Sequence, residues 1–173
     1  FQNYKSFREE TCFSMMAAPK QKGLDYSLFN IKNHGKGIKR LCSSVIYGSN
    51  AAGKTTVVGA MDTFRSILLR GHIRDSEDVS SPNHAASKLS LIPNNSLTKA
   101  EPVEFFIDFI VDKFRIQYGV VMDLGLFLDS KHKRKILAET LTVNGNMIFE
   151  RNHIDNTSTA LKVDPCKEVA ALF

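Results

Sequence analysis

A change from a β-type run to helical spacing near residue 53 is the strongest pattern in the chain. Residues 41–47 (LCSSVIY) are rich in β-forming types and end in a continuous apolar run, which predicts a buried strand. The segment after Gly53 should be a helix that ends near Arg70 and Gly71, a usual stop signal. Its apolar residues share one face at helical spacing: Val57, Val58, Met61, Phe64, Ile67 and Leu68. The pattern predicts a strand, a glycine-bounded loop and a helix in direct succession.

Short β-forming runs fill the stretch between residues 103 and 152. They predict four strands, at 103–112, 113–123, 134–143 and 146–152. Asn144 and Gly145, between the last two, suit a tight hairpin turn because both residue types tolerate positive φ. The connections are too short for crossover helices, so we expect an antiparallel meander.

The first forty residues carry weaker signals. Residues 1–7 (FQNYKSF) alternate enough to predict an edge strand, and residues 11–18 (TCFSMMAA) predict a second short strand. Residues 19–40 hold the Pro, Gly, Asn and Lys that are typical of a loop.

Two further segments complete the layout. Residues 71–102 are polar and contain three prolines, which predicts a long loop. Residues 164–173 resemble the start of a helix and have no stop signal. Because the chain also begins at Phe1 rather than Met, we expect it to be part of a longer protein.

Composition is that of an ordinary globular domain, with 173 residues of which 43% are hydrophobic and 24% charged. No apolar window is long enough for a membrane span and no signal peptide opens the chain, so we expect a cytoplasmic protein without membrane contact. The three cysteines are far apart and form no CxxC pair, which predicts buried free thiols. The five histidines are isolated and suggest no metal site.

The net charge of +5 is concentrated at one end of the chain. Residues 1–40 hold eight Lys or Arg against three acidic residues, whereas the rest of the chain is balanced. Positive charge attracts polyanions, so nucleic acid stays open as a partner. The basic run at 131–135 (KHKRK) joins two predicted strands, where such a run is more often a solvated connection than a binding site.

The residues between the predicted strand and helix match the pattern G-x-x-x-x-G-K-[ST]. The match, GSNAAGKT, runs from residue 48 to residue 55. Its glycines let the backbone wrap closely around phosphate, and its amides form an anion nest at the helix N-terminus. Lys54 would reach the β- and γ-phosphates, and the Thr55 hydroxyl would bind Mg²⁺. The predicted phosphate-binding residues are Gly48, Ser49, Asn50, Ala51, Ala52, Gly53, Lys54, Thr55 and Thr56.

Asn50, at the third position of this motif, and the NYKSF at residues 3–7 carry a family resemblance. G-x-N-x-x-G-K-[ST] preceded by N-[FY]-[KR]-S-F resembles the nucleotide-binding heads of the ABC, SMC and RecF-like ATPases. The chain is most similar to the stand-alone bacterial "AAA family ATPases", many of which belong to anti-phage or abortive-infection systems alongside OLD and Septu-type ATPases. The strand pair RKILAETLTV and NMIFER, with Glu139 and Leu141, resembles an E-x-L pair of that group.

The resemblance implies an α/β fold, a P-loop NTPase lobe of the ABC-ATPase type with an antiparallel β subdomain. Residues 1–173 would be the N-terminal part of one ATPase head. Its parts would be 1–70 with the Walker A loop, 71–102 as a loop, 103–151 as the meander and 152–173 as the start of a following segment.

The same resemblance implies ATP and Mg²⁺ as cofactors. It also implies hydrolysis in a homodimer or higher oligomer, an effector protein as partner and a role in bacterial anti-phage defence. The absence of an N-K-x-D guanine motif likewise favours ATP. DNA repair or chromosome maintenance is an alternative role for the same fold.

Catalytic residues of such a head are not recognisable in the chain. It has no convincing signature segment, no apolar run ending in Asp-Glu and no switch histidine. Asp108 and Asp123 end apolar runs within the predicted meander, but neither precedes a Glu, so we favour a solvent-facing strand end for Asp123 over a Walker B role. Gln117 lies in mid-strand, which disfavours a Q-loop role. A compact P-loop kinase or NTPase with Asp123 as metal ligand is the other alternative. It requires Asp123 on a strand parallel to and beside residues 45–47.

Overall fold

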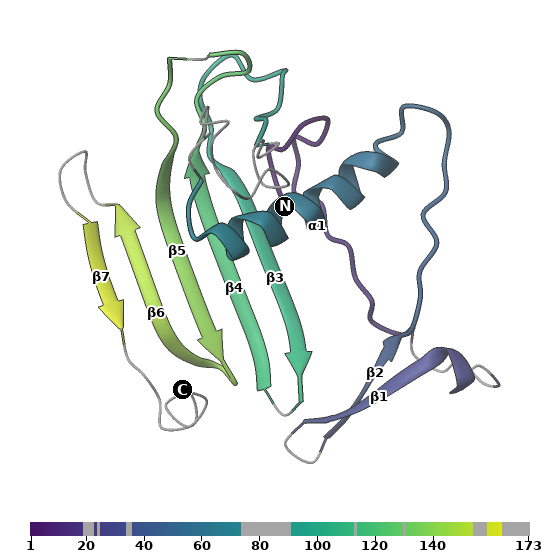
Figure 1. Ribbon diagram of the computed structural model, residues 1–173. Helices are drawn as coiled ribbons and strands as arrows, with labels where there is room; N and C mark the ends of the chain where they lie inside the picture. The colour runs from purple at the N-terminus through teal and green to yellow at the C-terminus, as the bar shows by residue number, and fades with distance from the viewer. Residues whose placement is uncertain are drawn as a thin grey trace, which may run out of the picture.

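The main body of the protein has two layers, a five-stranded sheet and one long helix, α1 (Lys54–Arg70), which crosses one face of the sheet (Figure 1). A separate two-stranded hairpin stands beside the sheet. The computed structural model describes residues 1–18, 23, 25–33, 36–73, 91–112, 114–129, 131–153 and 159–163.

The sheet is an antiparallel meander, as predicted. Its strands are β3 (Val103–Val111), β4 (Phe114–Asp123), β5 (Lys135–Val143), β6 (Asn146–His153) and β7 (Thr159–Val163). They lie side by side in chain order, and every neighbouring pair is antiparallel. The turn between β5 and β6 has φ of 51° at Asn144 and 84° at Gly145, which confirms the hairpin. β7 was not predicted, and the helix start expected at 164–173 lies outside the described residues.

Helix α1 confirms the predicted helix in both position and length. It ends at Gly71, whose φ of 67° and N–H bond to the Ile67 carbonyl close the last turn. The side chains buried against the sheet are Ala60, Thr63, Phe64 and Ile67. The predicted apolar face was too wide, because Val58, Met61 and Leu68 are exposed. In the described chain the sheet covers only one side of α1, so apolar side chains on the adjacent side stay outside the core.

The core lies where α1 crosses β3 and β4. Phe64 stacks on Phe105 and on Tyr118, with ring centroids 5.5 and 5.7 Å apart. Val103, Val120 and Met122 fill the space around these rings and are essentially inaccessible to solvent. Stacked aromatic rings and β-branched side chains therefore hold the helix on the sheet.

The predicted edge strand at residues 1–7 is wrong. The chain makes a tight turn there, with φ of 53° at Asn3 and 50° at Lys5, and only Gln2 forms a bridge with β3. Tyr4, within the turn, is fully buried, and its hydroxyl lies 3.0 Å from the Thr63 hydroxyl of α1. Burial of one aromatic ring between helix and sheet thus overrides the alternating pattern of the segment.

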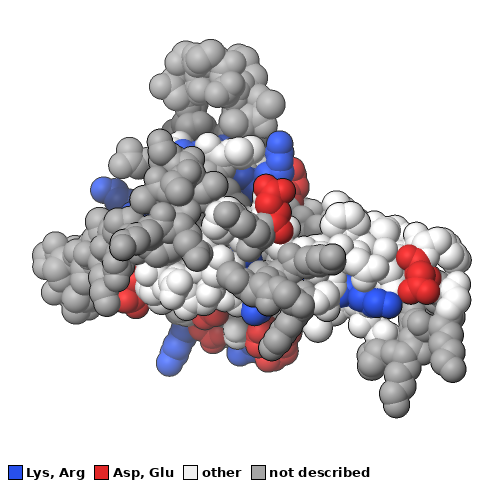
Figure 2. Space-filling model, turned by 90° about the horizontal axis from the view of Figure 1, so that it is seen from below, with Lys and Arg blue, Asp and Glu red and all other residues white. Residues whose placement is uncertain are grey.

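A hairpin replaces most of the loop predicted at 19–40. A short 3₁₀ turn (Asp25–Ser27) leads into β1 (Leu28–Asn33), which pairs with β2 (Lys36–Leu41) in antiparallel register. Seen from below, the Lys, Arg, Asp and Glu side chains of the described residues are intermingled (Figure 2). In this hairpin Lys39 Nζ lies 3.3 Å from the Asp25 carboxylate. Nucleic-acid contact by the N-terminal region stays a prediction.

The strands predicted at 11–18 and 41–47, before and after the hairpin in the chain, are not formed either. Residues 11–18 form only one isolated bridge, between Met16 and Arg40. Of the strand predicted at 41–47, only Leu41 belongs to a strand, and Val45 and Tyr47 are 83% and 91% exposed. Among the described residues no sheet neighbour lies beside this apolar run. An apolar run indicates that a segment tends to be buried. It becomes a strand only where a neighbouring strand pairs with its backbone hydrogen-bonding groups.

The long loop predicted at 71–102 is confirmed for its described ends, which contain no helix or named strand. Residues 74–90 lie outside the described part. The cysteine prediction is wrong for Cys12 and Cys42, which are exposed free thiols, and Cys166 is not described.

Candidate functional site

The glycine-bounded loop leads directly into α1. Ala51 and Gly53 have φ of 64° and 84°, and the Ala52 N–H donates to the Ser49 carbonyl at 3.3 Å. Gly53 forms the helix N-cap, and its carbonyl accepts from the amides of Thr56 and Val57 at 2.9 and 3.2 Å. Two left-handed residues within three positions curl the backbone around the helix N-terminus. This geometry suits an anion, because helix N-termini present unpaired N–H donors.

Lys54, the first residue of α1, reaches back across the loop. Its Nζ donates to the carbonyls of Gly48 at 2.9 Å and Ser49 at 2.6 Å. The ammonium thus spans the loop from the helix to the first glycine, on the exposed side. No acidic residue lies in the first turn of α1, so nothing there neutralises this charge locally.

All nine predicted phosphate-binding residues lie on this loop and the first helical turn. The five from Gly48 to Ala52 are exposed, as is Thr55. Gly53, Lys54 and Thr56 are half-buried. The side chain predicted to bind metal, Thr55, is therefore on the accessible side of the turn.

The turn formed by residues 1–7 packs against the loop. The Phe7 ring packs so closely on Gly53 that a Cβ at residue 53 would lie 2.8 Å from it. The Ser6 hydroxyl donates to the Thr56 hydroxyl at 3.3 Å. Sequence reasoning missed these contacts, although NYKSF was the segment that carried the resemblance. A sequence motif shows which residue types occur at fixed positions, but it does not show which of those residues are in contact.

Asp108 and Gln117 do not belong to this site. Arg115 donates to the two oxygens of Asp108 at 3.0 and 2.5 Å, and Gln117 donates to the same carboxylate at 3.3 Å. The hydrogen bond from Arg115 holds the pKa of Asp108 below its usual value. Gln117 in turn accepts from the Thr142 hydroxyl at 3.1 Å. These side chains form a polar row across the three adjacent strands β3, β4 and β5.

Asp123 is likewise engaged at the end of β4. Its Oδ1 accepts from the Gly125 amide and lies 2.9 Å from His132 Nε2. The neighbours of β4 are β3 and β5, both antiparallel, and residues 45–47 lie in no strand. The strand arrangement that a compact kinase or NTPase requires is therefore not met.

The basic run at 131–135 is only partly a solvated connection. Lys131, Lys133 and Lys135 are exposed, as predicted. Arg134 instead turns inward and donates to the Ile73 carbonyl at 3.3 Å.

Other kinds of site are not found where the structure is described. That part of the chain has no group of three or more His, Cys, Asp or Glu placed to hold a metal ion. None of its helices has the length and apolar character that a membrane crossing requires.

A glycine-bounded loop closed by a lysine at the start of a helix defines the P-loop class of nucleotide-binding proteins. The family described as "AAA domain, putative AbiEii toxin, Type IV TA system" matches residues 43–160, and the chain belongs to this family. The match takes in the loop, α1 and the sheet from β3 through β6. No curated protein and no solved structure matches the chain. Membership supports a nucleotide-binding, ATPase-like function, for which a nucleotide and usually Mg²⁺ are used.

Proposed function

We propose that the chain binds Mg-ATP through residues 48–56, as the Walker A part of an ABC-type ATPase. The observation that carries this proposal is Lys54, whose ammonium extends from the helix start over a loop curled by left-handed Ala51 and Gly53. A phosphate chain placed over the loop would receive the backbone N–H groups and the Lys54 charge together. On binding, the Lys54 ammonium would exchange its hydrogen bonds to the loop carbonyls for stronger ones to the more negative phosphate oxygens.

Different side chains of the loop would bind different parts of the nucleotide and its metal ion. Lys54 would bind the β- and γ-phosphates, and the exposed Thr55 hydroxyl would bind Mg²⁺. Mg²⁺ itself would neutralise phosphate charge. Phe7, packed on Gly53, would hold the loop in shape from the side opposite the phosphates.

We further propose that the complete ATPase hydrolyses ATP as a homodimer or higher oligomer, with further protein packed beside the loop. Exposed apolar residues on either side of the loop in the chain support this proposal: Val45 and Tyr47 before it, and Val58 and Met61 in the first half of α1. Apolar residues gathered on one surface usually mark a contact with other protein. The Walker B, signature and switch residues would lie outside residues 1–173, which would be the N-terminal part of the head.

The biological role that we propose is the cytoplasmic ATPase component of a bacterial anti-phage defence system, acting with an effector protein. Support comes from the family description, which names a toxin of a type IV toxin–antitoxin system. Nucleotide state would then control the assembly of the effector. DNA repair or chromosome maintenance remains the alternative within the same fold.

Thr55→Ala should weaken ATP binding only when Mg²⁺ is present. The hydroxyl is a metal ligand in the proposal, and the amides and Lys54 hold the phosphates without it. We expect about a tenfold loss of affinity with Mg²⁺, which corresponds to 1.4 kcal/mol, and little change in EDTA. Calorimetric titration under both conditions measures this, with the exposed Thr98→Ala as a matched control. An equal loss with and without Mg²⁺ would contradict the metal-binding role.

Turnover by residues 1–173 alone should not exceed the background rate. Catalysis of phosphoryl transfer depends on positioned groups that align water and stabilise charge, and the Walker A loop supplies only the binding part. Phosphate release measured across a concentration series tests this, with Lys54→Ala as the blank. Turnover that depends on Lys54 and stays constant per molecule on dilution would show a self-sufficient monomeric site and refute the proposal of shared sites.

A further inference from the structure

The connection between β4 and β5, residues 124–134, extends beyond the end of the sheet (Figure 1). Two bulky apolar side chains stand at its tip, where Phe127 is 43% exposed and Leu128 is 84% exposed. Leu128 also has a φ of 66°, in the left-handed region that a bulky residue rarely adopts. Because strained backbone persists mainly at functional positions, a strained leucine with its side chain in solvent points to a contact outside the described chain.

Hydrogen bonds close the base of this connection. Asp123 Oδ1 accepts from the Gly125 amide at 2.9 Å, and His132 Nε2 lies 2.9 Å from the same oxygen. Nearer the tip, the Asp129 N–H donates to the Leu126 carbonyl at 3.1 Å, and the Asp129 carbonyl accepts from the His132 amide at 3.3 Å. The exposure of the tip is therefore a property of an organised turn.

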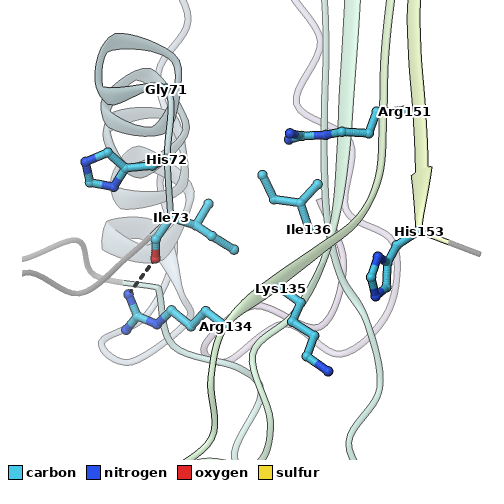
Figure 3. Close-up of a pocket in the computed structure, with 8 residues that line it drawn as sticks. All are labelled: Gly71, His72, Ile73, Arg134, Lys135, Ile136, Arg151 and His153. Carbon is cyan, nitrogen blue, oxygen red and sulfur yellow. Dashed lines mark hydrogen bonds between the residues drawn. The ribbon is translucent and has the colours of Figure 1, made fainter. Parts of the chain in front are cut away.

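Two contacts fix the connection to the rest of the fold. The His132 ring packs so closely on Gly125 that a Cβ at residue 125 would lie 2.5 Å from it. Arg134, at the end of the connection, donates to the Ile73 carbonyl at 3.3 Å (Figure 3). It also donates to the Leu91 carbonyl at 3.4 Å. The tip thus projects from a base that is bonded to other segments of the chain.

Two lysines stand directly beside the apolar tip. Lys131 and Lys133 are exposed, and neither forms an ion pair with the described residues. Arg134 and Lys135 are engaged within the chain and are not counted with them. Asp129 is the exposed acid of the connection, and its Oδ1 accepts from the Lys131 amide at 3.2 Å. The connection therefore presents two ammonium groups and two apolar side chains together.

This combination suits a lipid surface better than a protein partner. A membrane places hydrocarbon beneath headgroups that are often anionic, so apolar side chains and lysines can bind it at the same time. A specific protein interface buries about 800 Å² on each partner, whereas two side chains bury roughly 400 Å² at most. Membrane binding scales with the buried apolar area plus charge attraction, so a small tip gives weak and reversible binding.

We propose that Phe127 and Leu128 enter the surface layer of an anionic lipid membrane, with Lys131 and Lys133 against the headgroups. The sequence predicts no membrane contact because it has no span, but a tip of two residues enters only one leaflet. Several copies on one membrane would bind more tightly than one. The contact is separate from the proposed ATP site, which lies at the opposite end of α1, a helix of 17 residues and about 25 Å.

Tryptophan fluorescence tests the insertion directly, because the natural chain contains no tryptophan. The emission of Leu128→Trp should move saturably to shorter wavelength with vesicles of phosphatidylcholine and phosphatidylglycerol in equal amounts. Phosphatidylcholine vesicles, or added salt, should reduce the shift. Tyr26→Trp is the matched control, because Tyr26 is also 84% exposed but lies in the turn before β1, and it should not shift.

Three outcomes of this measurement would overturn the proposal. The first is an emission of Leu128→Trp that is the same with and without the anionic vesicles. The second is an equal shift of Leu128→Trp and Tyr26→Trp. The third is a shift that grows with protein concentration in the absence of vesicles, which would identify a protein surface as the partner of the tip.

Sedimentation with the same vesicles tests the side chains. Leu128→Gly removes the apolar side chain and suits a φ of 66°, so the protein should stay folded and bind vesicles about tenfold more weakly. Lys131→Glu should lose a similar factor on anionic vesicles only, whereas Arg65→Glu, exposed on α1, should bind normally. Lys54→Ala should also bind normally, which separates this result from the fate of the ATP site. Unchanged binding by Leu128→Gly, or equal losses in Lys131→Glu and Arg65→Glu, would refute the contact.

Discussion

Lys54→Ala should reduce the affinity for Mg-ATP by about a hundredfold or more. The proposed role of Lys54 is to bind two phosphate groups, and each charge-assisted hydrogen bond contributes about 1.5–3 kcal/mol. Among the described residues, Lys54 is the cation that reaches over the loop, where its Nζ lies 2.9 and 2.6 Å from the Gly48 and Ser49 carbonyls. Without it the backbone amides would face the phosphates with no mobile positive charge.

Stability should be nearly unchanged by the same substitution. Both hydrogen bonds of Lys54 are exposed, and exposed substitutions usually change the free energy of unfolding by less than about 0.5 kcal/mol. Calorimetric titration with Mg-ATP and a thermal melt measure the two quantities separately. Lys99→Ala is the matched control, because Lys99 is exposed in the loop before β3. ATP bound equally well by Lys54→Ala would disprove the Walker A assignment.

Gly53→Ala should lower both stability and ATP affinity. Residue 53 has φ of 84°, which costs a residue with a side chain about 1–2 kcal/mol. In addition, its Cβ would lie 2.8 Å from the Phe7 ring, and overpacking of this kind costs about 1–3 kcal/mol. We expect a total loss of about 2–5 kcal/mol in the free energy of unfolding. ATP binding should fall as well, because the loop amides move with residue 53.

Gly71→Ala is the matched control for the backbone part of this effect. Its φ is 67°, and nothing lies within 4 Å of a Cβ placed there. Urea unfolding should therefore show a loss of only about 1–2 kcal/mol. Combining Phe7→Ala with Gly53→Ala should recover the part that comes from the collision, which a double-mutant cycle isolates. If Gly53→Ala and Gly71→Ala lose equal stability and the cycle shows no coupling, Phe7 does not support the loop.

Elements with a strong local period were predictable from the sequence. Helix α1 begins and ends within a residue of its prediction, because helical spacing and the Gly71 stop are properties of the segment itself. The antiparallel meander was predictable for a similar reason, since short connections and the Asn144-Gly145 turn leave little other choice. The loop residues were identified by their spacing alone. Whether they bind nucleotide stays a prediction.

Segments without a period of their own were decided by tertiary contacts. Tyr4 is buried between α1 and β3, so residues 1–7 form a turn although they alternate like a strand. Residues 45–47 look like a core strand but are not in one, because pairing depends on a neighbour that the run itself does not specify.

Side-chain contacts across distant parts of the chain could not be predicted at all. Phe7 packs on Gly53, and Arg134 donates to the carbonyl of Ile73 after α1, only because the fold brings these distant segments together. Local sequence determined α1, the strands β3 to β6 and the loop, since their spacing and turns involve near neighbours. The packing of Phe7 on the loop and the bond from Arg134 to Ile73 arose from tertiary structure, which joins residues that the sequence separates.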